Sequence, residues 1–280
     1  MRCYINIHIS ILEEYYDLAT AYLSNYPTLG IEERLDELIV CFDYDDWNPK
    51  RKLNILADLN KIDKNIVITK EESYEEKNWN EDWKKNVLPI TVNERIGITP
   101  TWKASELISD LKILINPKMS FGTGNHESTR LMCRLIENYI TPGSLWIDAG
   151  CGTGVLSILA VKLGAAKVFA FDNNIWAVEN SKENFELNDV ASSIEILEAD
   201  VESAALPPSD FIAANLNRNI IIKSIHLLRN ALISNEGRIL VSGILSYDRD
   251  EIISIAKKNN LVLDSFLTEG EWIAFCFKVK

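Results

Sequence analysis

The segment from Leu145 to Gly154 constrains the fold of this chain more than any other segment. Its sequence, L-W-I-D-A-G-C-G-T-G, joins an apolar strand that ends in Asp148 to a glycine-dense turn, and a helical pattern begins at Val155. Glycine is needed where the backbone takes a positive φ or approaches a ligand closely. The free N–H groups in the first turn of a helix can face such a ligand. The segment therefore predicts a strand, a tight turn and a helix N-terminus that together form a binding site.

The glycine spacing and a second acidic residue indicate the kind of ligand. The pattern D-x-G-x-G-x-G differs from both the dinucleotide fingerprint G-x-G-x-x-G and the P-loop G-x-x-x-x-G-K-[ST]. Asp172 ends the next apolar strand, where a carboxylate can accept hydrogen bonds from both hydroxyls of a ribose. The combination resembles the S-adenosylmethionine site of class I methyltransferases. The alternative is a glycine turn in an ordinary α/β protein.

Length and charge limit the domain organisation and the partners. A chain of 280 residues is long for one compact domain and comfortable for two. Its formal charge of -12 argues against binding nucleic acid through phosphates, which requires clustered Lys and Arg, and suits a basic protein partner. We expect a monomer that does not bind nucleic acid directly.

The distribution of cysteine, histidine and apolar residues excludes several other classes. No disulfide framework, CxxC pair or protein-built metal site is expected, because the five cysteines and three histidines are scattered. The alternating N-terminus predicts a strand and not a signal peptide, and no apolar run approaches the roughly 20 residues of a membrane span. We therefore expect a cytoplasmic protein. The cysteines are Cys3, Cys41, Cys133, Cys151 and Cys276, and the histidines are His8, His126 and His226.

Residues 1–70 alternate strand and helix patterns at short intervals and lack a cofactor motif. They predict a small N-terminal α+β domain that recognises the substrate, with helices on one face of an antiparallel sheet. Residues 71–90 are acidic and polar, with Trp79 and Trp83 on one helical face, and predict an interdomain linker. In residues 1–70 the expected strands are 1–10, 37–43 and 65–69, and the expected helices are 11–26 and 50–59.

Residues 91–280 predict an α/β catalytic domain. After the glycine turn, strands and helices alternate, which indicates βαβ units and a Rossmann-like parallel sheet. The last two strands, 261–267 and 272–278, are separated by only four residues and predict a hairpin, so the sheet gains an antiparallel C-terminal edge. Class I methyltransferases have this arrangement.

A second glycine-rich loop precedes the main motif, over residues 116–129. It reads N-P-K-M-S-F-G-T-G-N-H-E-S-T and leads into a helix predicted over about 127–139, with N-caps offered by Asn125, Ser128 and Thr129. The loop carries Phe121 and His126 and can close over a ligand as a lid. The alternative is a helix-entry turn in which His126 is a capping or surface residue.

Polar residues follow two later strands. Asp200 and Val201 come after one strand and Asn215 after the next, and open α/β sheets bind ligands at such carboxyl ends. Asp200 can accept a hydrogen bond from the exocyclic amine of an adenine, and the Asn215 side chain can accept one from the N–H of an amine. In both cases the alternative is a cap on the following helix.

Together these segments resemble the ribosomal protein L11 methyltransferase family, whose members join an N-terminal recognition domain to a class I catalytic domain. The resemblance covers residues 75–280 well and residues 1–70 only in layout. The segments that carry it are N-W-x-x-D-W-K (78–84), M-S-F-G-T-G-N-H-E-S-T (119–129), D-A-G-C-G-T-G (148–154), A-N-L (214–216), G-I-L (243–245) and G-E-W (270–272).

The resemblance implies both the cofactor and the chemistry. It implies that S-adenosylmethionine supplies a methyl group to a lysine ε-amino or N-terminal α-amino group of a protein, most directly ribosomal protein L11. Asn215 would orient the amine, while Phe121 and His126 would exclude water. The implied cofactor contacts are Thr129, Gly150, Gly152, Asp172 and Asn215, with Asp200 and Val201 near the adenine and Gly122 lining the same region.

One departure from the family pattern and two other functions need to be considered. Asn217 and Arg218 stand where family members often have an aromatic or small apolar residue, which affects how the amine is held. A nucleic-acid amine methyltransferase usually carries [DN]-P-P-[YFW] at this point, to stack a flipped base, and this chain lacks both prolines and the aromatic residue. The other alternative is a non-catalytic module that binds the cofactor and docks on a ribosomal protein.

Overall fold

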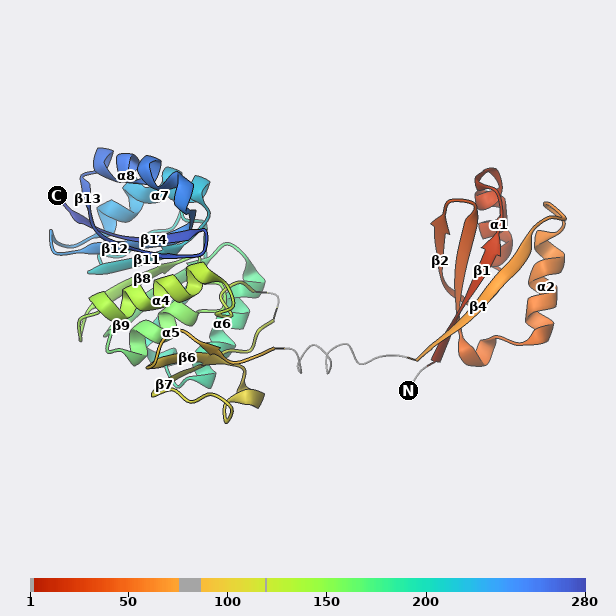
Figure 1. Ribbon diagram of the computed structural model, residues 1–280, viewed down its shortest axis with the longest axis horizontal. Helices are drawn as coiled ribbons and strands as arrows, with labels where there is room; N and C mark the ends of the chain where they lie inside the picture. The colour runs from red at the N-terminus through yellow and green to blue at the C-terminus, as the bar shows by residue number, and fades with distance from the viewer. Residues whose placement is uncertain (1–2, 76–86, 119) are drawn as a thin grey trace. The chain divides into compact units, whose positions relative to one another are not determined.

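The computed structural model describes residues 3–75, 87–118 and 120–280. The chain divides into two compact units, Met1–Lys85 and Asn86–Lys280 (Figure 1). Strand β4 runs from Val67 to Glu75 and so extends five residues into the segment predicted as a linker. The two tryptophans of that segment, Trp79 and Trp83, lie outside the described residues.

The described part of the first unit is an antiparallel sheet covered on one face by two helices, which confirms the predicted α+β layout (Figure 1). The sheet contains one strand that was not predicted, β2, because its sequence T-L-G-I-E-E-R lies at the sheet edge, is largely exposed and shows no apolar alternation. The strand order is β2-β3-β1-β4, with β1 Cys3–Ser10, β2 Thr28–Arg34, β3 Glu37–Asp43, α1 Tyr16–Leu23 and α2 Pro49–Leu59.

Alternation along the two central strands builds the core of this unit. Ile5, Ile7 and Ile9 of β1 are buried against the helices together with Leu38, Val40 and Phe42 of β3. The residues between them face the other side of the sheet, where polar groups interact with one another. There His8 lies 3.0 Å from Glu37 and 3.2 Å from Glu72, measured between ring nitrogen and carboxylate oxygen. One face is therefore apolar and covered by the helices, and the other carries most of the polar groups, with Ile39 buried among them.

The described part of the second unit contains a seven-stranded sheet of the predicted type. Five strands, in the order β10-β9-β8-β11-β12, pair in parallel. Strands β14 and β13 add an antiparallel hairpin beside β12. The predicted α/β fold class is confirmed. The strands are β8 Leu145–Ala149, β9 Lys167–Asp172, β10 Ile194–Glu198, β11 Phe211–Asn215, β12 Arg238–Leu245, β13 Leu261–Glu269 and β14 Trp272–Val279.

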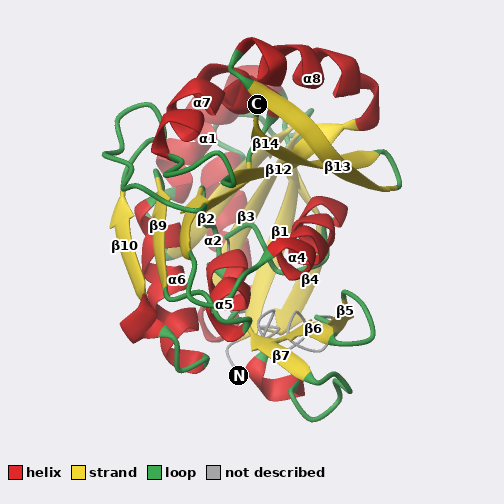
Figure 2. Cartoon of the chain, turned by 90° about the vertical axis from the view of Figure 1, so that its left-hand side faces the viewer, coloured by secondary structure: helices red, strands yellow, loops and turns green. Residues whose placement is uncertain are grey.

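Helices cover both faces of this sheet. Figures 1 and 2 show α7 and α8 on the opposite side from α4 and α5, and each set packs with the sheet into its own apolar cluster. The helices are α4 Glu127–Tyr139, α5 Val155–Lys162, α6 Ile175–Leu187, α7 Arg218–Ala231 and α8 Arg249–Lys258. Short 3₁₀ helices lie at Glu13–Tyr15, Tyr44–Asp46, Thr101–Lys103, Ala191–Ser193 and Ser246–Asp248.

Three short strands between residues 90 and 115 form a separate small sheet. It has the order β5-β6-β7, with β5 Ile90–Thr91, β6 Ile96–Thr99 and β7 Leu111–Leu114. Ile96, Ile98 and Ile113 join the apolar cluster beneath α4 and α5. This sheet therefore supports the start of the loop that leads to α4. No helix among the described residues is long and apolar enough to cross a membrane.

The core of the first unit gives a prediction. Ile7 is fully buried on β1, so Ile7→Ala removes apolar contacts and leaves a cavity that should cost about 2–5 kcal/mol of stability. Amide hydrogen exchange should accelerate in β1 and β3 and stay unchanged in β8. The control is Leu53→Ala, because Leu53 is 67% exposed on α2. Equal acceleration in β8 would contradict the division into two independently cored units.

Candidate active site

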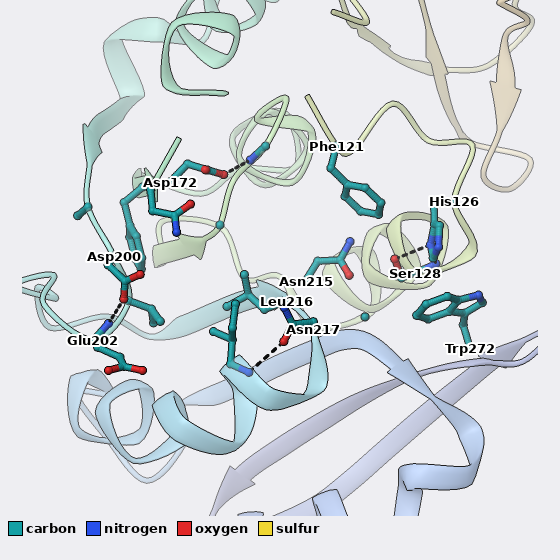
Figure 3. A pocket seen from close by; sticks show the side chains of 18 residues that line it. Phe121, His126, Ser128, Asp172, Asp200, Glu202, Asn215, Leu216, Asn217 and Trp272 are labelled. Atoms are coloured by element: carbon teal, nitrogen blue, oxygen red, sulfur yellow. Dashed lines mark hydrogen bonds between the residues drawn. The ribbon is translucent and has the colours of Figure 1, made fainter. Parts of the chain in front are cut away.

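A cavity of about 390 Å³ opens at the carboxyl ends of the parallel strands. It lies where β8 and β11 are neighbours and the strand order reverses, the position at which open α/β sheets bind ligands. Its size lies within the range of small-molecule sites. Figure 3 shows the acidic side chains of Asp172, Asp200 and Glu202 on one side and the aromatic side chains of Phe121, His126 and Trp272 on the other.

The glycine turn forms the floor of this cavity. Gly150 and Gly152 both have positive φ, at 70° and 56°. The carbonyl of Phe171, on β9, accepts hydrogen bonds from the N–H groups of Gly150 (2.9 Å) and Cys151 (3.0 Å). A Cβ on Gly152 would lie 2.3 Å from the carbonyl oxygen of Phe121, so the turn leaves no room for a side chain there.

The second glycine-rich loop is bound to this turn. The Thr153 N–H donates to the Phe121 carbonyl at 2.8 Å, and the Thr153 hydroxyl donates to the Gly122 carbonyl at 2.7 Å. These bonds hold the backbone of the loop, whereas the Phe121 side chain stays 54% exposed. The loop therefore sits at the cavity with its backbone held and its aromatic side chain more than half exposed.

Two acidic residues line the cavity with their carboxylates already oriented. Asp172, at the end of β9, accepts hydrogen bonds from the N–H groups of Gly152 (2.9 Å) and Asn174 (3.0 Å). Asp200 accepts one from the N–H of Glu202 at 2.8 Å. Each carboxylate oxygen can accept more than one hydrogen bond. Both side chains can therefore still bind hydroxyl or amine groups of a ligand, and the buried Val201, next to Asp200 in the chain, adds apolar surface to the cavity.

Asn215 is the last residue of β11 and lines the middle of the cavity (Figure 3). Its side-chain oxygen is buried and has no hydrogen-bond partner among the described residues. Gly243 on β12 makes this arrangement possible, because a Cβ there would lie 2.4 Å from the Leu216 carbonyl oxygen. A buried carbonyl oxygen without a partner costs free energy, and a ligand N–H would remove that cost.

Three aromatic rings form one wall of the cavity. The ring centroids of Phe121 and His126 are 5.2 Å apart, and those of His126 and Trp272 are 4.4 Å apart with the rings edge to face. His126 is also the N-cap of α4, since its Nδ1 accepts a hydrogen bond from the Ser128 N–H at 3.2 Å. The caps predicted at Asn125, Ser128 and Thr129 are wrong, because the helix begins one residue after His126.

Thr129 is fully buried in α4 and is not among the residues that line the cavity. Its hydroxyl oxygen has no partner within the described part of the chain. Gly122, which was expected to line the same region, does not line the cavity either. The remaining predicted site residues do, namely Phe121, His126, Gly150, Gly152, Asp172, Asp200, Val201 and Asn215. Near the start of a helix, the sequence alone does not show which residue faces the cavity and which faces the protein interior, so Thr129 could not be placed.

Asp148 is a buried carboxylate beneath the glycine turn. Burial raises its pKa to about 6, although one oxygen accepts hydrogen bonds from the Ser157 N–H (3.0 Å) and hydroxyl (2.6 Å), which act to lower it. The other oxygen has no partner among the described residues. Sequence reasoning identified Asp148 as part of the motif but did not predict that an uncompensated charge would be buried there.

The departure at Asn217 and Arg218 has a structural explanation. Asn217 is the N-cap of α7 and accepts a hydrogen bond from the Ile220 N–H at 3.1 Å. Arg218 forms ion pairs with Asp248, at 3.3 Å, and with Glu251, and it does not line the cavity. Asn217 therefore caps α7 and also lines the cavity, whereas Arg218 lies outside it.

Sequence reasoning missed several lining residues. Most of them lie one to five residues after the end of a predicted strand. Closeness to such a strand end could therefore have identified them as lining residues. Trp272 was named only as part of the G-E-W segment of the family resemblance. Its contact with a loop more than a hundred residues earlier leaves no local pattern in the sequence. The missed residues are Ser128, Phe171, Asn173, Ala199, Glu202, Leu216, Ile220, Gly243 and Trp272. In residues 3–75, 87–118 and 120–280, no three His, Cys, Asp or Glu side chains are grouped to hold a metal ion.

The sheet order with its antiparallel hairpin, the glycine turn and the acidic strand end define a class I methyltransferase. A family model described as "Ribosomal protein L11 methyltransferase (PrmA)" matches residues 13–280. The chain belongs to this family.

Relatives agree over nearly the whole chain. A ribosomal protein L11 methyltransferase of Chlorobaculum tepidum is 33% identical over 279 residues, which cover 97% of this chain and 95% of that protein. One of Streptococcus thermophilus is 33% identical over 230 residues, covering 81% of this chain and 71% of that protein. The crystal structure of a ribosomal protein L11 methylase from Lactobacillus delbrueckii subsp. bulgaricus is 27% identical. It has a TM-score of 0.64 and covers 69% of this chain and 98% of that one.

The buried Asp148 gives a prediction about pH. A carboxyl group whose pKa is raised by folding destabilises the folded state when it is ionised, so the cost is full above pH 6 and absent below its ordinary value of 3.8. Asp148→Asn keeps an acceptor for Ser157 and removes the charge. Without ligand, it should raise the free energy of unfolding at pH 8 by on the order of 2–3 kcal/mol.

Urea unfolding between pH 4 and pH 8 measures this effect. The gain should shrink as pH falls from about 6 to about 4, the interval between the folded and ordinary pKa values. The exposed residue Asp110 offers the control Asp110→Asn, which should show no such trend. A variant at position 148 that is less stable than wild type at pH 8 would show that the ionised carboxylate is stabilising.

Proposed function

We propose that this chain is a cytoplasmic S-adenosylmethionine-dependent N-methyltransferase of ribosomal protein L11, acting on lysine ε-amino or N-terminal α-amino groups. One observation carries the proposal. The Asn215 side chain presents a buried oxygen that has no partner in the described part of the chain, in a cavity that lies between a glycine turn and an aromatic wall. An amine that must be oriented and kept from water needs such an acceptor in such a place.

The cavity suits this cofactor on several counts. Gly150 and Gly152 line the cavity with bare backbone, because a Cβ would collide with Leu216 at the first position and with the Phe121 carbonyl at the second. Asp172 is held where it can accept the ribose hydroxyls, and Asp200 with Val201 can receive the adenine. Asp148, directly before the turn, has one buried carboxylate oxygen without a described partner, and its negative charge when ionised favours a positively charged ligand nearby.

The residues of the chain act mainly by alignment. When bound, the cofactor supplies a methyl group on a positively charged sulfur. The amine that accepts this methyl group would be neutral, and the methylated ammonium product would release a proton to solvent. Asn215 accepts a hydrogen bond from the amine and directs its lone pair. The wall of Phe121, His126 and Trp272 limits the access of water to this side of the cavity.

The first unit supports a basic protein partner. Residues paired across adjacent strands point to the same face, so the open face of its sheet carries Glu32, Glu37, Asp43 and Glu72. These carboxylates exceed the basic groups that the same pairing places there, Arg34 and Lys70. An excess of carboxylates attracts Lys-rich and Arg-rich surfaces. The same charge balance disfavours a nucleic-acid substrate, as do the acidic residues beside the cavity.

The experiment is incubation of purified ribosomal protein L11 with the enzyme and S-adenosylmethionine, followed by intact-mass measurement and peptide mapping. Methyl-sized increments are expected with wild type. Asn215→Ala should lower kcat/KM by about 100-fold or more, because one preorganised polar contact at a reacting group has this effect. The control is Asn174→Ser, since Asn174 caps α6 and serine can replace it.

The possible results separate the alternatives. Cofactor binding without a mass increase on L11 would remove the substrate assignment and favour a non-catalytic module or another substrate. Methylation by Asn215→Ala at the wild-type rate would remove the role given to that side chain. Methylation of RNA and not of L11 would favour the nucleic-acid alternative.

The glycine turn gives a second prediction, on cofactor affinity. Gly152 and Gly143 both have positive φ, but a Cβ at Gly143 meets no described atom within 4 Å. Both alanine variants should therefore lose about 1 kcal/mol to backbone strain. Only Gly152→Ala should displace the Phe121 carbonyl and weaken S-adenosylmethionine binding, by roughly tenfold or more in calorimetric titration. Equal affinity in both variants would contradict the placement of the cofactor on this turn.

A further inference from the structure

An ion-pair cluster lies behind the aromatic wall. Glu269, at the end of β13, accepts hydrogen bonds from Arg130 Nε at 2.8 Å and from Arg134 Nη1 at 2.7 Å, and Arg130 Nη2 lies 2.6 Å from its Oε1. All three side chains are partly buried. Burial raises the pKa of the Glu269 carboxyl, but the two arginines outweigh burial and leave that pKa below its ordinary value. Glu269 is therefore ionised at neutral pH and bound on both oxygens.

Arg130 also binds the loop that carries the aromatic residues. Its Nη1 donates to the carbonyl of Gly124 at 3.1 Å and to the carbonyl of Asn125. These two carbonyls directly precede His126, the N-cap of α4 and the central ring of the wall. A single guanidinium therefore joins the end of the loop to Glu269. Arginine suits this task because its donors are fixed in one plane.

Glu269 in turn positions the hairpin. It is paired with Trp272 across the β13–β14 turn, so the arginines that bind the Glu269 carboxylate also fix the backbone that carries the Trp272 ring. Trp272 packs edge to face on His126 and lines the cavity (Figure 3). The cluster thus connects the two segments that supply the rings, although these segments are far apart in the chain. Arg134 adds an anchor, since its Nε and Nη2 donate to the Val92 carbonyl at 3.1 and 3.0 Å.

We infer that Arg130 and Glu269 are positioning residues of the active site, which hold His126 and Trp272 together as the wall beside Asn215. This inference rests on the proposed function for its kinetic consequence but not for its structural one. Neither residue lines the cavity, so each acts through the rings and not through contact with a ligand. Loss of the pair should leave cofactor binding intact and should impair the alignment of the amine.

The same hairpin offers a matched control. Asp264 on β13 is also bound by two basic residues, Arg238 at 3.4 Å and Lys278 at 3.0 Å. Its side chain is 19% exposed and that of Glu269 is 27% exposed, so the two carboxylates are similarly buried. Its neighbours in the sheet lie toward the other end of β14, away from Trp272. Glu269→Gln and Asp264→Asn therefore remove similar charges from the same strand at different distances from the cavity.

The test compares both variants and Arg130→Lys with wild type in the full-length chain. Hydrogen exchange should accelerate at least about threefold in residues 120–126 for Glu269→Gln, because local opening becomes easier, and should stay at the wild-type rate there for Asp264→Asn. Turnover of L11 should fall about tenfold in kcat for Glu269→Gln, with S-adenosylmethionine affinity within about twofold of wild type. Arg130→Lys keeps the charge but loses the planar donors, and should show a smaller effect in the same direction.

Several results would overturn the inference. Equal exchange in residues 120–126 for Glu269→Gln and Asp264→Asn would show that the cluster does not hold the loop. Faster exchange with unchanged kcat would show that the wall does not need to be held. If wild type does not methylate L11, the proposed function fails, and the exchange comparison, which needs no substrate, still decides whether the pair positions the loop.

Discussion

The binding of the glycine turn by three neighbouring segments is the constraint on which the site depends. The Phe171 carbonyl on β9 holds the first part of the turn, the Phe121 carbonyl holds Thr153, and the side-chain amide of Asn184 on α6 donates to the Thr153 carbonyl at 2.9 Å. A turn with several residues at positive φ keeps a single shape only when its peptide groups are satisfied in this way. The cavity therefore exists only when β9, α6 and the second loop are all in place.

Asparagines one turn apart on α6 extend this constraint to the small sheet. Asn184 accepts a hydrogen bond from the Asn116 N–H at 2.7 Å, and Asn188 both accepts from the Leu114 N–H and donates to the Leu114 carbonyl. Asn180 donates to the Asn116 carbonyl at 3.1 Å. Residues 114–116 and the glycine turn are thus attached to one helix, which fixes the start of the loop that carries Phe121. The side chains of Asn184 and Asn188 both donate and accept here, whereas the side-chain oxygen of Asn180 has no partner among the described residues. Buried amides that are satisfied in this way favour a unique arrangement.

The two sides of the cavity divide the chemistry between them. Carboxylates whose positions are set by backbone N–H groups lie on the side of β9 and β10, where polar groups of a cofactor can be bound. Aromatic rings lie on the side of α4 and the hairpin, where a side chain can be shielded from water. Asn215 lies between them, on the strand next to the point where the sheet order reverses. Asp148 beneath the turn is a buried carboxyl group whose pKa is raised by burial, so its ionised form is expected to cost stability at the site itself.

Sequence alone determined the features that depend on neighbours in the chain. Local patterns identified the parallel sheet, the glycine turn, Asp172 and Asn215, because apolar alternation, glycine and polar strand ends act over a few residues. The edge strand β2 escaped detection, since a strand exposed on both faces carries no apolar pattern. Only the tertiary structure decided that Thr129 lies behind the cavity, that His126 is both a cap and a wall, and that Trp272 and Glu269 meet α4. Those relations join segments more than a hundred residues apart, and packing and the completion of buried hydrogen bonds select them, which no local pattern encodes.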